Sequence, residues 1–460
     1  MEFDKKARKI ANEILKHREI LVVTHIDADG ISAGAIAYES LKRAGIETSI
    51  KFVKQLGDKE IEELKDKNTF IWFTDLGSGQ IDKLTDLDFV ITDHHIPIAK
   101  HEMQLNPNDF GLDGSFELSG AGTTFMVASK LKSERRTIFD FTDVNLDLIN
   151  LAIVGAVGDL QDSAECMLKG KNRDIVKKAE KNNFLKVVRD LRFFGKQTRP
   201  IAKMLEYNIE PYLPGISGNE KGCVRFLSSL SIDPWKRWIE LSFEEKKKIV
   251  SELVRLCMEF GMPYKNILRI VGECYILLDK PEGTEMRDAM EFSTLLNATA
   301  RYGEEEIGLR VCLGDENAFK RARSLLQNHR KNLSEGLRLV EELGIEELKN
   351  IQFFHAQDEI PDTIVGIIAG MSFHKGNFDK PIVAFAKSEN GVKVSARATQ
   401  RLIERGVNLA EAIRKAAEKV GGSGGGHKIA AGATIPEGKE IEFLNFLDEI
   451  VGEQLENRKI

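Results

Sequence analysis

Aspartate and histidine side chains follow three short apolar runs in this 460-residue sequence, 19–24, 70–74 and 89–92. The residues that follow these runs are His25, Asp27, Asp29, Asp75, Asp93, His94 and His95. Continuous apolar runs of this length are typical of strands buried on both faces, as in a parallel sheet. Ligand sites in open α/β sheets lie beyond the carboxyl ends of the strands. The three runs together therefore predict a metal site.

The donor atoms of this set are a few imidazole nitrogens and a larger number of carboxylate oxygens. Such a set suits Mn²⁺ or Mg²⁺ better than structural Zn²⁺, which prefers cysteine. An isolated histidine or aspartate is more often a satisfied core or surface residue, but that does not explain the same pattern at two independent strand ends. Burying so many like charges requires cations, and the number of acids indicates two ions bridged by one carboxylate. Sites of this kind hydrolyse phosphoester or phosphoanhydride bonds.

The segments between these runs have the periodicity of helices and of one further strand, at 4–18, 31–44, 48–53 and 58–66. A small-residue apolar segment, 149–160, predicts a packed helix whose polar end is Asp159. An acid at that position could cap the helix or belong to the metal site. The first part of the chain is therefore expected to fold as an α/β domain.

Length and composition place limits on the rest. A chain of 460 residues is too long for one ordinary core, so two or three domains are expected. The net charge of −6 argues against a uniformly basic nucleic-acid coat and leaves room for a local basic channel. The five cysteines form no CxxC pair, and no signal segment or long apolar run is present. We therefore expect a cytoplasmic protein in a reducing environment, without contact with a membrane.

The middle of the chain, from 166 to 345, has helical and charged patterns, including one long helix over 316–342. Its segment 169–203 contains 12 lysines and arginines but only three acids. A solvated helix face and a contact for a nucleic-acid backbone both explain such a run, and the nearby phosphate chemistry favours the second.

The last hundred residues begin a new pattern of strands and helices. A glycine-rich turn is expected at 421–427, where Gly424, Gly425 and Gly426 precede His427. Such a turn lets a ligand approach the backbone N–H groups, and the histidine adds a directed charge. Arg397, at the end of a predicted strand, carries the forked guanidinium that suits phosphate.

These motifs, in this order, resemble the four metal motifs of the DHH phosphoesterase superfamily, and the turn before His427 resembles the signature of its associated C-terminal domain. Segment 296–301 and the helix after it are similar to the connector of RecJ-type nucleases. The resemblance covers about 1–165 and 290–460 and points to the archaeal RecJ-like nucleases, which include the GINS-associated nuclease. It implies an α/β fold with a parallel-sheet catalytic domain over 1–165. A mainly helical insertion and connector would occupy 166–345, and a smaller α/β substrate-binding domain across a cleft would occupy 346–460.

The resemblance also implies a role for each residue. One metal would bind His25, Asp27 and Asp75, and the other would bind Asp29, Asp75, His94 and Asp159. Asp93 would support a metal-binding histidine, and His95 would face the scissile phosphate. Arg397, Gly424, Gly425, Gly426 and His427 would hold a neighbouring phosphate. Bacterial RecJ proteins usually have aspartate where this chain has His25, so that residue does not decide the substrate.

The resulting hypothesis is an exonuclease that hydrolyses single-stranded nucleic acid with two Mn²⁺ or Mg²⁺ ions in DNA replication or repair. The resemblance favours 5′→3′ cleavage of single-stranded DNA and leaves RNA open as a substrate. One alternative is an oligoribonuclease or nucleotide bisphosphate phosphatase. Another is a replication scaffold that binds GINS through 200–290, with catalysis secondary. The complete set of metal ligands favours an active enzyme, and the large middle region favours a polymeric substrate.

Overall fold

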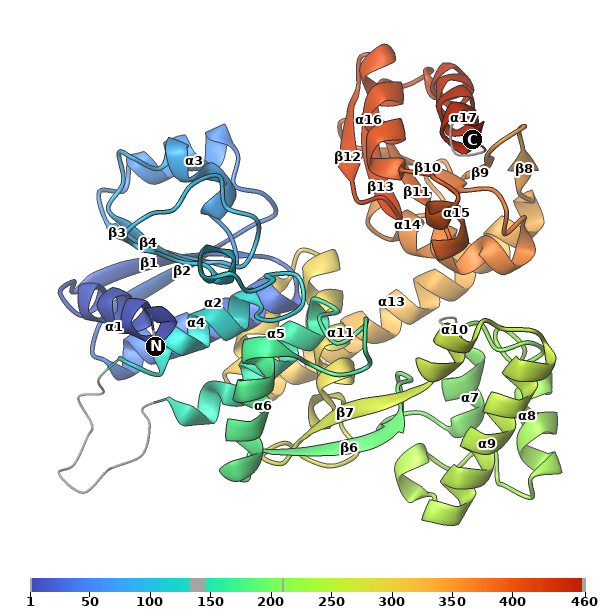
Figure 1. Cartoon of the computed structure of the whole chain (residues 1–460), viewed down its shortest axis with the longest axis horizontal. Coiled ribbons are helices and arrows are strands. Elements are labelled where there is room, and N and C mark those ends of the chain that lie inside the picture. The colour runs from blue at the N-terminus through green and yellow to red at the C-terminus, as the bar shows by residue number, and fades with distance from the viewer. Residues whose placement is uncertain (1, 132–144, 209–210, 457–460) are drawn as a thin grey trace. The chain divides into compact units, whose positions relative to one another are not determined.

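The computed structural model describes residues 2–131, 145–208 and 211–456. The chain divides into two compact units, Met1–Leu325 and Leu326–Ile460 (Figure 1). Each unit has hydrophobic cores of its own. The three-domain division at 165 and 345 stays a prediction.

The first unit contains a five-stranded parallel sheet with the strand order β2-β1-β3-β4-β5. Its strands are β1 (Glu19–His25), β2 (Glu47–Val53), β3 (Phe70–Thr74), β4 (Phe89–Thr92) and β5 (Gln104–Leu105). β3 and β4 are buried along their whole length, and β1 is buried at every residue except its two ends. Burial on both faces explains why these strands are apolar without alternation, and the predicted parallel sheet is confirmed.

Helices cover both faces of this sheet. They are α1 (Glu2–Ile14), α2 (Ala28–Arg43), α3 (Asp58–Lys65), α4 (Gly120–Ala128) and α5 (Ile149–Gly158). On one face of the sheet, α3 packs together with the 3-10 turn Ser78–Lys83. On the other face, α2 and α4 pack against the central strands, and α5 packs against these two helices. α2 begins at Asp27, whose side chain accepts a hydrogen bond from the Gly30 N–H at 2.9 Å. Such an N-cap satisfies a free donor of the first helical turn.

The middle region is mainly helical, as predicted. Its helices are α6 (Gly170–Lys181), α7 (Ile201–Glu206), α8 (Glu220–Ser229), α9 (Phe243–Glu259), α10 (Tyr264–Leu268), α11 (Ala289–Arg301) and α12 (Glu305–Cys312). The region also holds an antiparallel ribbon in which β6 (Leu185–Leu191) pairs with β7 (Val271–Leu277). This ribbon was not predicted, because its strands are of mixed polarity and lie far apart in the chain.

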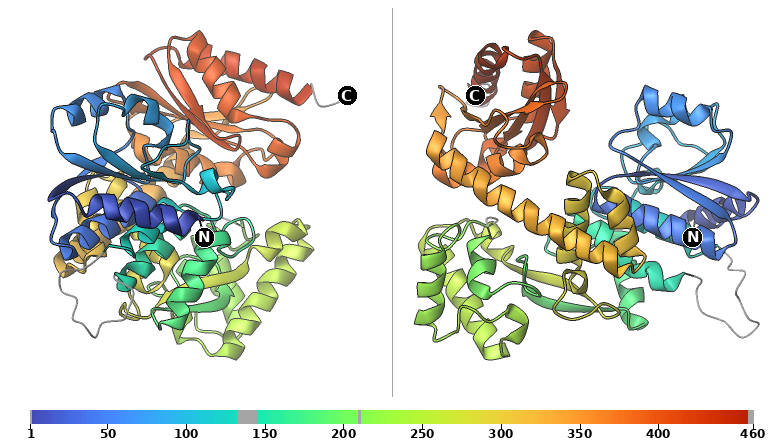
Figure 2. Two further views of the ribbon diagram at one scale, coloured as in Figure 1. Left: turned by 60° about the vertical axis from the view of Figure 1, so that its left-hand side comes forward. Right: turned by 180° about the vertical axis from the view of Figure 1, so that it is seen from behind.

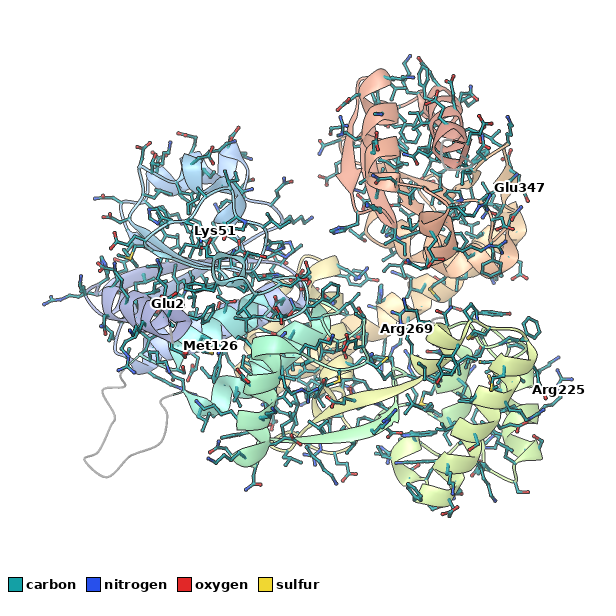
Figure 3. All side chains as sticks on the ribbon, in the orientation of Figure 1. Glu2, Lys51, Met126, Arg225, Arg269 and Glu347 are labelled. Carbon is teal, nitrogen blue, oxygen red and sulfur yellow. The ribbon has the colours of Figure 1, made fainter. Side chains whose placement is uncertain are left out.

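The helices α7 to α10 form a module at the far end of the ribbon (Figures 1 and 2). Its core gathers around large side chains such as Phe193 and Trp238. Arg225, on the outer side of α8, projects into solvent (Figure 3). This module therefore has a core distinct from that of the parallel sheet.

One continuous helix, α13 (Glu316–Leu343), crosses the division between the units, which confirms the predicted long helix (Figure 2). The second unit is built on a six-stranded sheet with the order β12-β13-β11-β10-β9-β8. β9 and β10 are parallel, and the other neighbours are antiparallel. The strands are β8 (Glu346–Glu347), β9 (Gln352–His355), β10 (Ile382–Ser388), β11 (Gly391–Arg397), β12 (Ser423–Gly426) and β13 (Ala430–Ile435).

The helices of the second unit are α14 (Asp362–Met371), α15 (Gln400–Glu404), α16 (Leu409–Lys419) and α17 (Glu440–Glu456). α14 packs on β10 and β11 on one face of the sheet, and α16 and α17 form a core with the opposite face.

The glycine-rich segment 421–427 differs from the prediction. It contains the edge strand β12, which pairs with β13 so that Gly425 lies opposite Gly432. A Cβ at Gly424 would lie 2.8 Å from the Ala433 Cβ, so glycine permits the close pairing. The prediction of a turn was wrong because a glycine-rich edge strand and a glycine-rich turn have the same composition.

Within the described residues no helix has both the length and the apolar character that a membrane crossing requires. The five cysteines are free thiols.

Candidate metal centre

The eight candidate residues of the first unit lie together at the carboxyl edge of its sheet. They come from the ends of β1, β3 and β4, the first turn of α2 and the end of α5. Their donor atoms form three groups, each with all atoms within 4.8 Å of one another: Asp75, Asp93, His94 and His95; His25, Asp27 and Asp75; Asp29, His94 and Asp159. Asp75 and His94 each belong to two groups, so the three groups form one continuous cluster.

Asp75 lies at the centre of this cluster and is only 2% exposed. Its Oδ1 lies 3.2 Å from His94 Nε2, and its Oδ2 lies 3.8 Å from His25 Nδ1. The residue has a φ of 60°, in the left-handed region that few residues other than glycine adopt. Residues held in this conformation are concentrated at functional sites, where the surrounding structure maintains the strain.

The cluster fits a divalent cation. Within the described residues, Asp75 Oδ1 and His25 Nδ1 are buried without a hydrogen-bond partner. A buried carboxylate oxygen in that condition costs free energy unless a cation compensates it. The donors around these two atoms are carboxylates and imidazoles, which suit Mn²⁺ or Mg²⁺.

Gly120 and Gly155 have no side chains and so leave the space that the Asp75 and Asp29 carboxylates occupy. A Cβ at Gly120 would lie 2.2 Å from Asp75 Oδ1, and a Cβ at Gly155 would lie 2.3 Å from Asp29 Oδ1. Because Gly120 has no side chain, the start of α4 approaches the cluster closely. The N–H groups of Gly120 and Ala121 donate to the two oxygens of Asp29 at 2.7 and 2.9 Å. The helix N-terminus thus stabilises a buried negative charge.

Replacing Gly120 with alanine should displace Asp75 and weaken Mn²⁺ binding by about 10- to 100-fold, the range for a change next to a metal ligand. Isothermal titration calorimetry measures this affinity. Gly79→Ala is the matched control, since a Cβ at Gly79 would meet nothing within 4 Å. Equal Mn²⁺ affinity of the two variants would contradict the proposed positioning of Asp75.

His94 is oriented by a main-chain carbonyl. Its Nδ1 lies 2.7 Å from the Gly114 oxygen, which can only accept, so Nδ1 carries the proton. Nε2 then offers a lone pair to a metal, and it lies 3.2 Å from Asp75 and 3.7 Å from Asp29. Asp159 Oδ2 lies 3.8 Å from His94 Nδ1.

Gln161 was not predicted, but it supports two parts of the cluster. Its side-chain nitrogen donates to the Gly114 oxygen at 2.8 Å and to Asp159 Oδ2 at 3.0 Å. Its own oxygen accepts from Asn172 at 2.6 Å, and both amides are buried. The only signal in the sequence is its place two residues after Asp159. Such support around metal ligands fixes their orientation.

Replacing Gln161 with leucine, which has a similar volume, should weaken Mn²⁺ binding by about 10- to 100-fold. The reason is that Asp159 loses a hydrogen bond and the carbonyl that orients His94 loses another. Gln400→Leu, at an exposed position of the second unit, provides the control. An unchanged affinity in Gln161→Leu would show that these hydrogen bonds do not position the ligands.

Asp93 and His95 form a hydrogen-bonded pair. His95 Nδ1 lies 2.8 Å from Asp93 Oδ1, while the N–H of Ser78 donates to the other oxygen at 3.0 Å. Burial opposes ionisation of Asp93, but the hydrogen bond from His95 holds its pKa below the usual range. That hydrogen bond in turn raises the pKa of His95. The His95 side chain is 59% exposed, so the pair presents a fixed, readily protonated imidazole to solvent.

His25 and Asp27 lie on the opposite side of Asp75, with His25 Nδ1 3.1 Å from Asp27 Oδ2. Burial lowers the pKa of His25, but the nearby Asp27 carboxylate outweighs burial and the pKa is raised. The loop is braced from a distant helix, because the Ala28 N–H donates to Asn297 of α11 at 2.9 Å.

The protonation of the cluster follows from its burial. Burial raises the pKa of Asp75 well above its usual value, and the nearby Asp29 carboxylate raises it further. Burial also raises the pKa of Asp159 to about 6. For His94, burial acts to lower the pKa, but the Asp75 carboxylate 3.2 Å from its Nε2 raises it well above the usual value. The metal-free site therefore holds protons that cations would displace.

These shifts predict how stability depends on pH. Asp75 and Asp159 bind protons more tightly in the metal-free fold than in the unfolded chain, so stability falls as pH rises from the ordinary value of 3.8 through the raised values. The stabilisation from protonated His94 is complete below 6.5 and is lost as pH rises through its raised pKa.

The metal-free protein should therefore lose thermal stability as pH rises through about 6, where Asp159 releases its proton, and continue to lose it above 6.5 as His94 does, and added Mn²⁺ should stabilise it more at the higher pH. Differential scanning calorimetry with and without Mn²⁺ measures both effects. Asp75→Asn and Asp159→Asn together should flatten the metal-free profile. A Mn²⁺ stabilisation that is independent of pH would contradict the assignment.

The residues predicted to bind substrate lie in the second unit. Arg397 is the last residue of β11 and pairs with Ala430, while Gly424, Gly425 and Gly426 belong to the edge strand β12. His427 follows β12 and is exposed. The position of these residues relative to the first unit's cluster stays a prediction.

The basic run 169–203 is used largely within the fold. Six of its cations form ion pairs with acids among the described residues: Lys169, Lys171, Arg173, Arg192, Lys196 and Lys203. Arg199 lies between the rings of Phe194 and Tyr207, at 4.6 and 5.0 Å. A contact with nucleic acid therefore stays a prediction for exposed lysines such as Lys177 and Lys181.

Comparison with known families matches three domains along the chain. Residues 19–153 match the N-terminal domain of the DHH family, 193–271 match the DHH-CID domain and 350–453 match the DHHA1 domain. An uncharacterized protein of Methanocaldococcus jannaschii is 33% identical over 468 residues, which cover 99% of this chain and 98% of that protein.

Solved structures share the fold over nearly the whole chain. Exonuclease RecJ bound to manganese has a TM-score of 0.59 and 17% identity, covering 100% of this chain and 97% of that one. RecJ from Thermus thermophilus in complex with Mn²⁺ has the same score and identity, and the match covers 98% of this chain but 55% of that longer chain. CDC45 from Entamoeba histolytica has a TM-score of 0.65 and 13% identity, covering 98% of both chains.

The matched domains, their order and the full-length relative agree with the DHH motifs gathered around Asp75. The chain belongs to the DHH superfamily, and its fold is like that of RecJ.

Proposed function

We propose that this protein is a metal-dependent exonuclease that hydrolyses phosphodiester bonds of single-stranded nucleic acid, acting 5′→3′ on single-stranded DNA in replication or repair. The observation that carries the proposal is the buried Asp75 oxygen without a hydrogen-bond partner among the described residues, surrounded by carboxylates and imidazoles. The RecJ-like fold supports the same conclusion.

Two Mn²⁺ or Mg²⁺ ions fit the donor set. His25, Asp27 and Asp75 would hold one ion, and Asp29, Asp75, His94 and Asp159 would hold the other. When bound, such ions activate water and neutralise the charge that develops on a phosphate. The solved RecJ structures contain Mn²⁺ or Mg²⁺, which supports this choice of metal.

The chain's own residues position the ligands and move a proton. The N–H groups at the start of α4 fix Asp29, and the Gly114 carbonyl fixes the His94 ring with Nε2 toward Asp75. His95, held through Nδ1 by Asp93, has its Nε2 available to donate a proton to the leaving oxygen. The pKa of His95 is raised by that contact, which favours the protonated ring that a general acid needs.

The substrate assignment rests on the second unit. Arg397, the glycines of β12 and His427 would bind phosphate groups of the strand. The alternative is an oligoribonuclease or nucleotide bisphosphate phosphatase, which would need only a small phosphate site.

Digestion of single-stranded DNA and RNA labelled at one end, with Mn²⁺, distinguishes these activities. Short products released from a 5′ label and absent in Asp75→Ala are expected. Degradation that starts at the 3′ end would be consistent with the metal chemistry but would show that cleavage runs 3′→5′. Turnover of dinucleotides or bisphosphates without cleavage of longer strands would contradict the exonuclease proposal and support the oligoribonuclease or bisphosphate phosphatase.

A second function, docking on the GINS complex, is favoured by the surface of the helical module. Large apolar side chains are exposed there: Trp235, Phe243, Met258, Phe260, Tyr264 and Leu268. Exposed apolar surface of this extent is typical of protein interfaces. The structural similarity to CDC45 includes this module.

A pull-down with purified GINS tests this docking. The wild-type protein should retain GINS, and a Phe260→Ser, Tyr264→Ser double variant should lose it while keeping nuclease activity. Failure of the wild-type protein to retain GINS would remove this second function without affecting the first.

A further inference from the structure

Arg192 connects the helical module to the loop that carries Asp159. It is the residue after β6, and its neighbours Leu191 and Phe193 are both buried in the core of the module. Its backbone N–H donates to the Ile270 oxygen at 3.0 Å, directly before β7. The module and the ribbon therefore fix the backbone of this arginine, while its side chain extends to the loop 159–166 after α5.

The Arg192 guanidinium holds this loop by two contacts with one residue. Its Nη1 donates to the main-chain oxygen of Asp162 at 2.9 Å, and its Nη2 lies 2.7 Å from the Asp162 carboxylate. The two side chains are 9% and 3% exposed, so water competes little for these contacts. A guanidinium that binds a carboxylate and a carbonyl of the same residue fixes both the side chain and the backbone of that residue.

Gly272 of β7 leaves the space for this arrangement. A Cβ at Gly272 would lie 2.6 Å from the Arg192 Cδ and 2.5 Å from the Cβ of Cys166, at the far end of the loop. The next residue of β7, Glu273, donates its N–H to the Cys166 oxygen at 2.9 Å. The ribbon and the residue that follows it thus contact the loop at two points.

The loop needs this support because its backbone turns at a leucine. Leu160 has a φ of 57°, a conformation that glycine usually supplies where a helix ends. Across this turn the Gln161 N–H donates to the Ala156 oxygen at 3.0 Å. A residue with a side chain keeps such a conformation only where the surrounding structure maintains it. Asp159 directly precedes the leucine, so the position of its carboxylate depends on the same turn.

We infer that Arg192 positions the metal ligand Asp159 and thereby makes the helical module part of the support of the metal centre. Arg192 holds Asp162, and the intervening Gln161 donates to Asp159 at 3.0 Å. The arginine acts through the loop and is a positioning residue. The inference rests on the proposed function, in which Asp159 holds one of two ions.

Calorimetric titration of the full-length protein with Mn²⁺ tests the inference. Arg192→Gln should lower the affinity for one of the two ions by about tenfold, the lower end of the range for groups that support metal ligands, and should leave the other ion unchanged. Arg189→Gln is the matched control, since Arg189 is an exposed arginine of β6, and it should bind both ions as the wild type does.

Arg192→Lys keeps the measurement possible if loss of the buried ion pair unfolds the protein. Lysine retains the charge but lacks the fork, so this variant should lose about threefold in affinity for the same ion. Trp238→Phe is the structural control: it removes a buried hydrogen bond to Asp190 of β6 but leaves Arg192 in place. It should lower the melting temperature without changing either Mn²⁺ affinity.

A change at Leu160 separates positioning from a general loss of stability. In the Arg192→Gln background, Leu160→Gly should restore most of the lost Mn²⁺ affinity, because glycine adopts a positive φ without support. Leu160→Ala removes the same side chain but keeps a Cβ, so it should restore little.

Steady-state hydrolysis of a single-stranded oligothymidylate with Mn²⁺ is the second readout. Arg192→Gln should lower kcat by about tenfold and leave KM unchanged, because it disturbs the metal centre and not the binding of the strand. A raised KM with an unchanged kcat would assign Arg192 to the strand and overturn the inference.

The inference is also overturned if both Arg192 variants bind Mn²⁺ as the wild type does, or if Leu160→Ala restores the affinity as well as Leu160→Gly. A wild-type protein that binds two Mn²⁺ ions but cleaves no strand would contradict the proposed exonuclease, while the calorimetric test of Arg192 would still decide the inference.

Discussion

Replacing Asp75 with asparagine should reduce Mn²⁺-dependent hydrolysis of single-stranded DNA by about 10³-fold or more. The variant keeps the side-chain volume but removes the negative charge that the two proposed metal sites share. It also removes a buried carboxyl group whose ionisation opposes folding without metal, so the thermal stability of the variant without metal should equal or exceed that of the wild type at a pH where that group would ionise. Initial rates with saturating Mn²⁺ and melting temperatures in EDTA measure the two effects.

Asp82→Asn is the matched control, since Asp82 is an exposed aspartate in the 3-10 turn after β3. It should leave hydrolysis and stability unchanged. If Asp75→Asn retained more than a tenth of the wild-type rate, Asp75 would not be the shared ligand. A large loss of folding in the metal-free variant would instead assign Asp75 a structural role.

Replacing His95 with alanine should lower the rate of hydrolysis by about 10²- to 10⁴-fold, the range for a general acid, without changing Mn²⁺ affinity. The reason is that His95 is exposed and held by Asp93, whereas His94 faces Asp75 and Asp29. A nucleotide ester with a good leaving group, such as a p-nitrophenyl ester, needs less protonation and should be hydrolysed at a rate closer to that of the wild type.

The pH profile separates catalysis from structure. The fall in rate at high pH, which reports loss of the acid's proton, should disappear in His95→Ala. Asp93→Asn should move that fall to lower pH, because the raised pKa of His95 depends on the Asp93 carboxylate. His101→Ala, at another exposed histidine of the first unit, should keep the wild-type profile. Weakened Mn²⁺ binding in His95→Ala would contradict its role as an acid and make it a ligand.

The candidate ligands other than Asp159 could be predicted from the sequence because they follow strands that are apolar without interruption. A parallel sheet brings such strand ends to one edge, so His25, Asp75 and His94 meet although they are far apart in the chain. The positive φ of Asp75 and the space left by Gly120 depend on tertiary contacts and leave no local signal.

The supporting groups could not be predicted for the same reason. The carbonyl that orients His94 belongs to Gly114, and any residue supplies a carbonyl. Gln161 is joined to Asp159 and Asn172 only in the folded chain. The β6–β7 ribbon likewise depends on pairing between distant segments, and the strand character of Gly424–Gly426 depends on β13. A local sequence pattern identifies a helix or strand when the burial of its own residues determines the structure. The pattern fails when pairing with a distant segment determines the structure.

The position and number of bound Mn²⁺ ions test the central claim most directly. Anomalous diffraction from crystals grown with Mn²⁺, together with calorimetric stoichiometry in solution, gives both values. Two ions per chain are expected, one held by His25, Asp27 and Asp75 and the other by Asp29, Asp75, His94 and Asp159. No ion at Asp75, or a single ion that Asp75→Asn leaves in place, would contradict it.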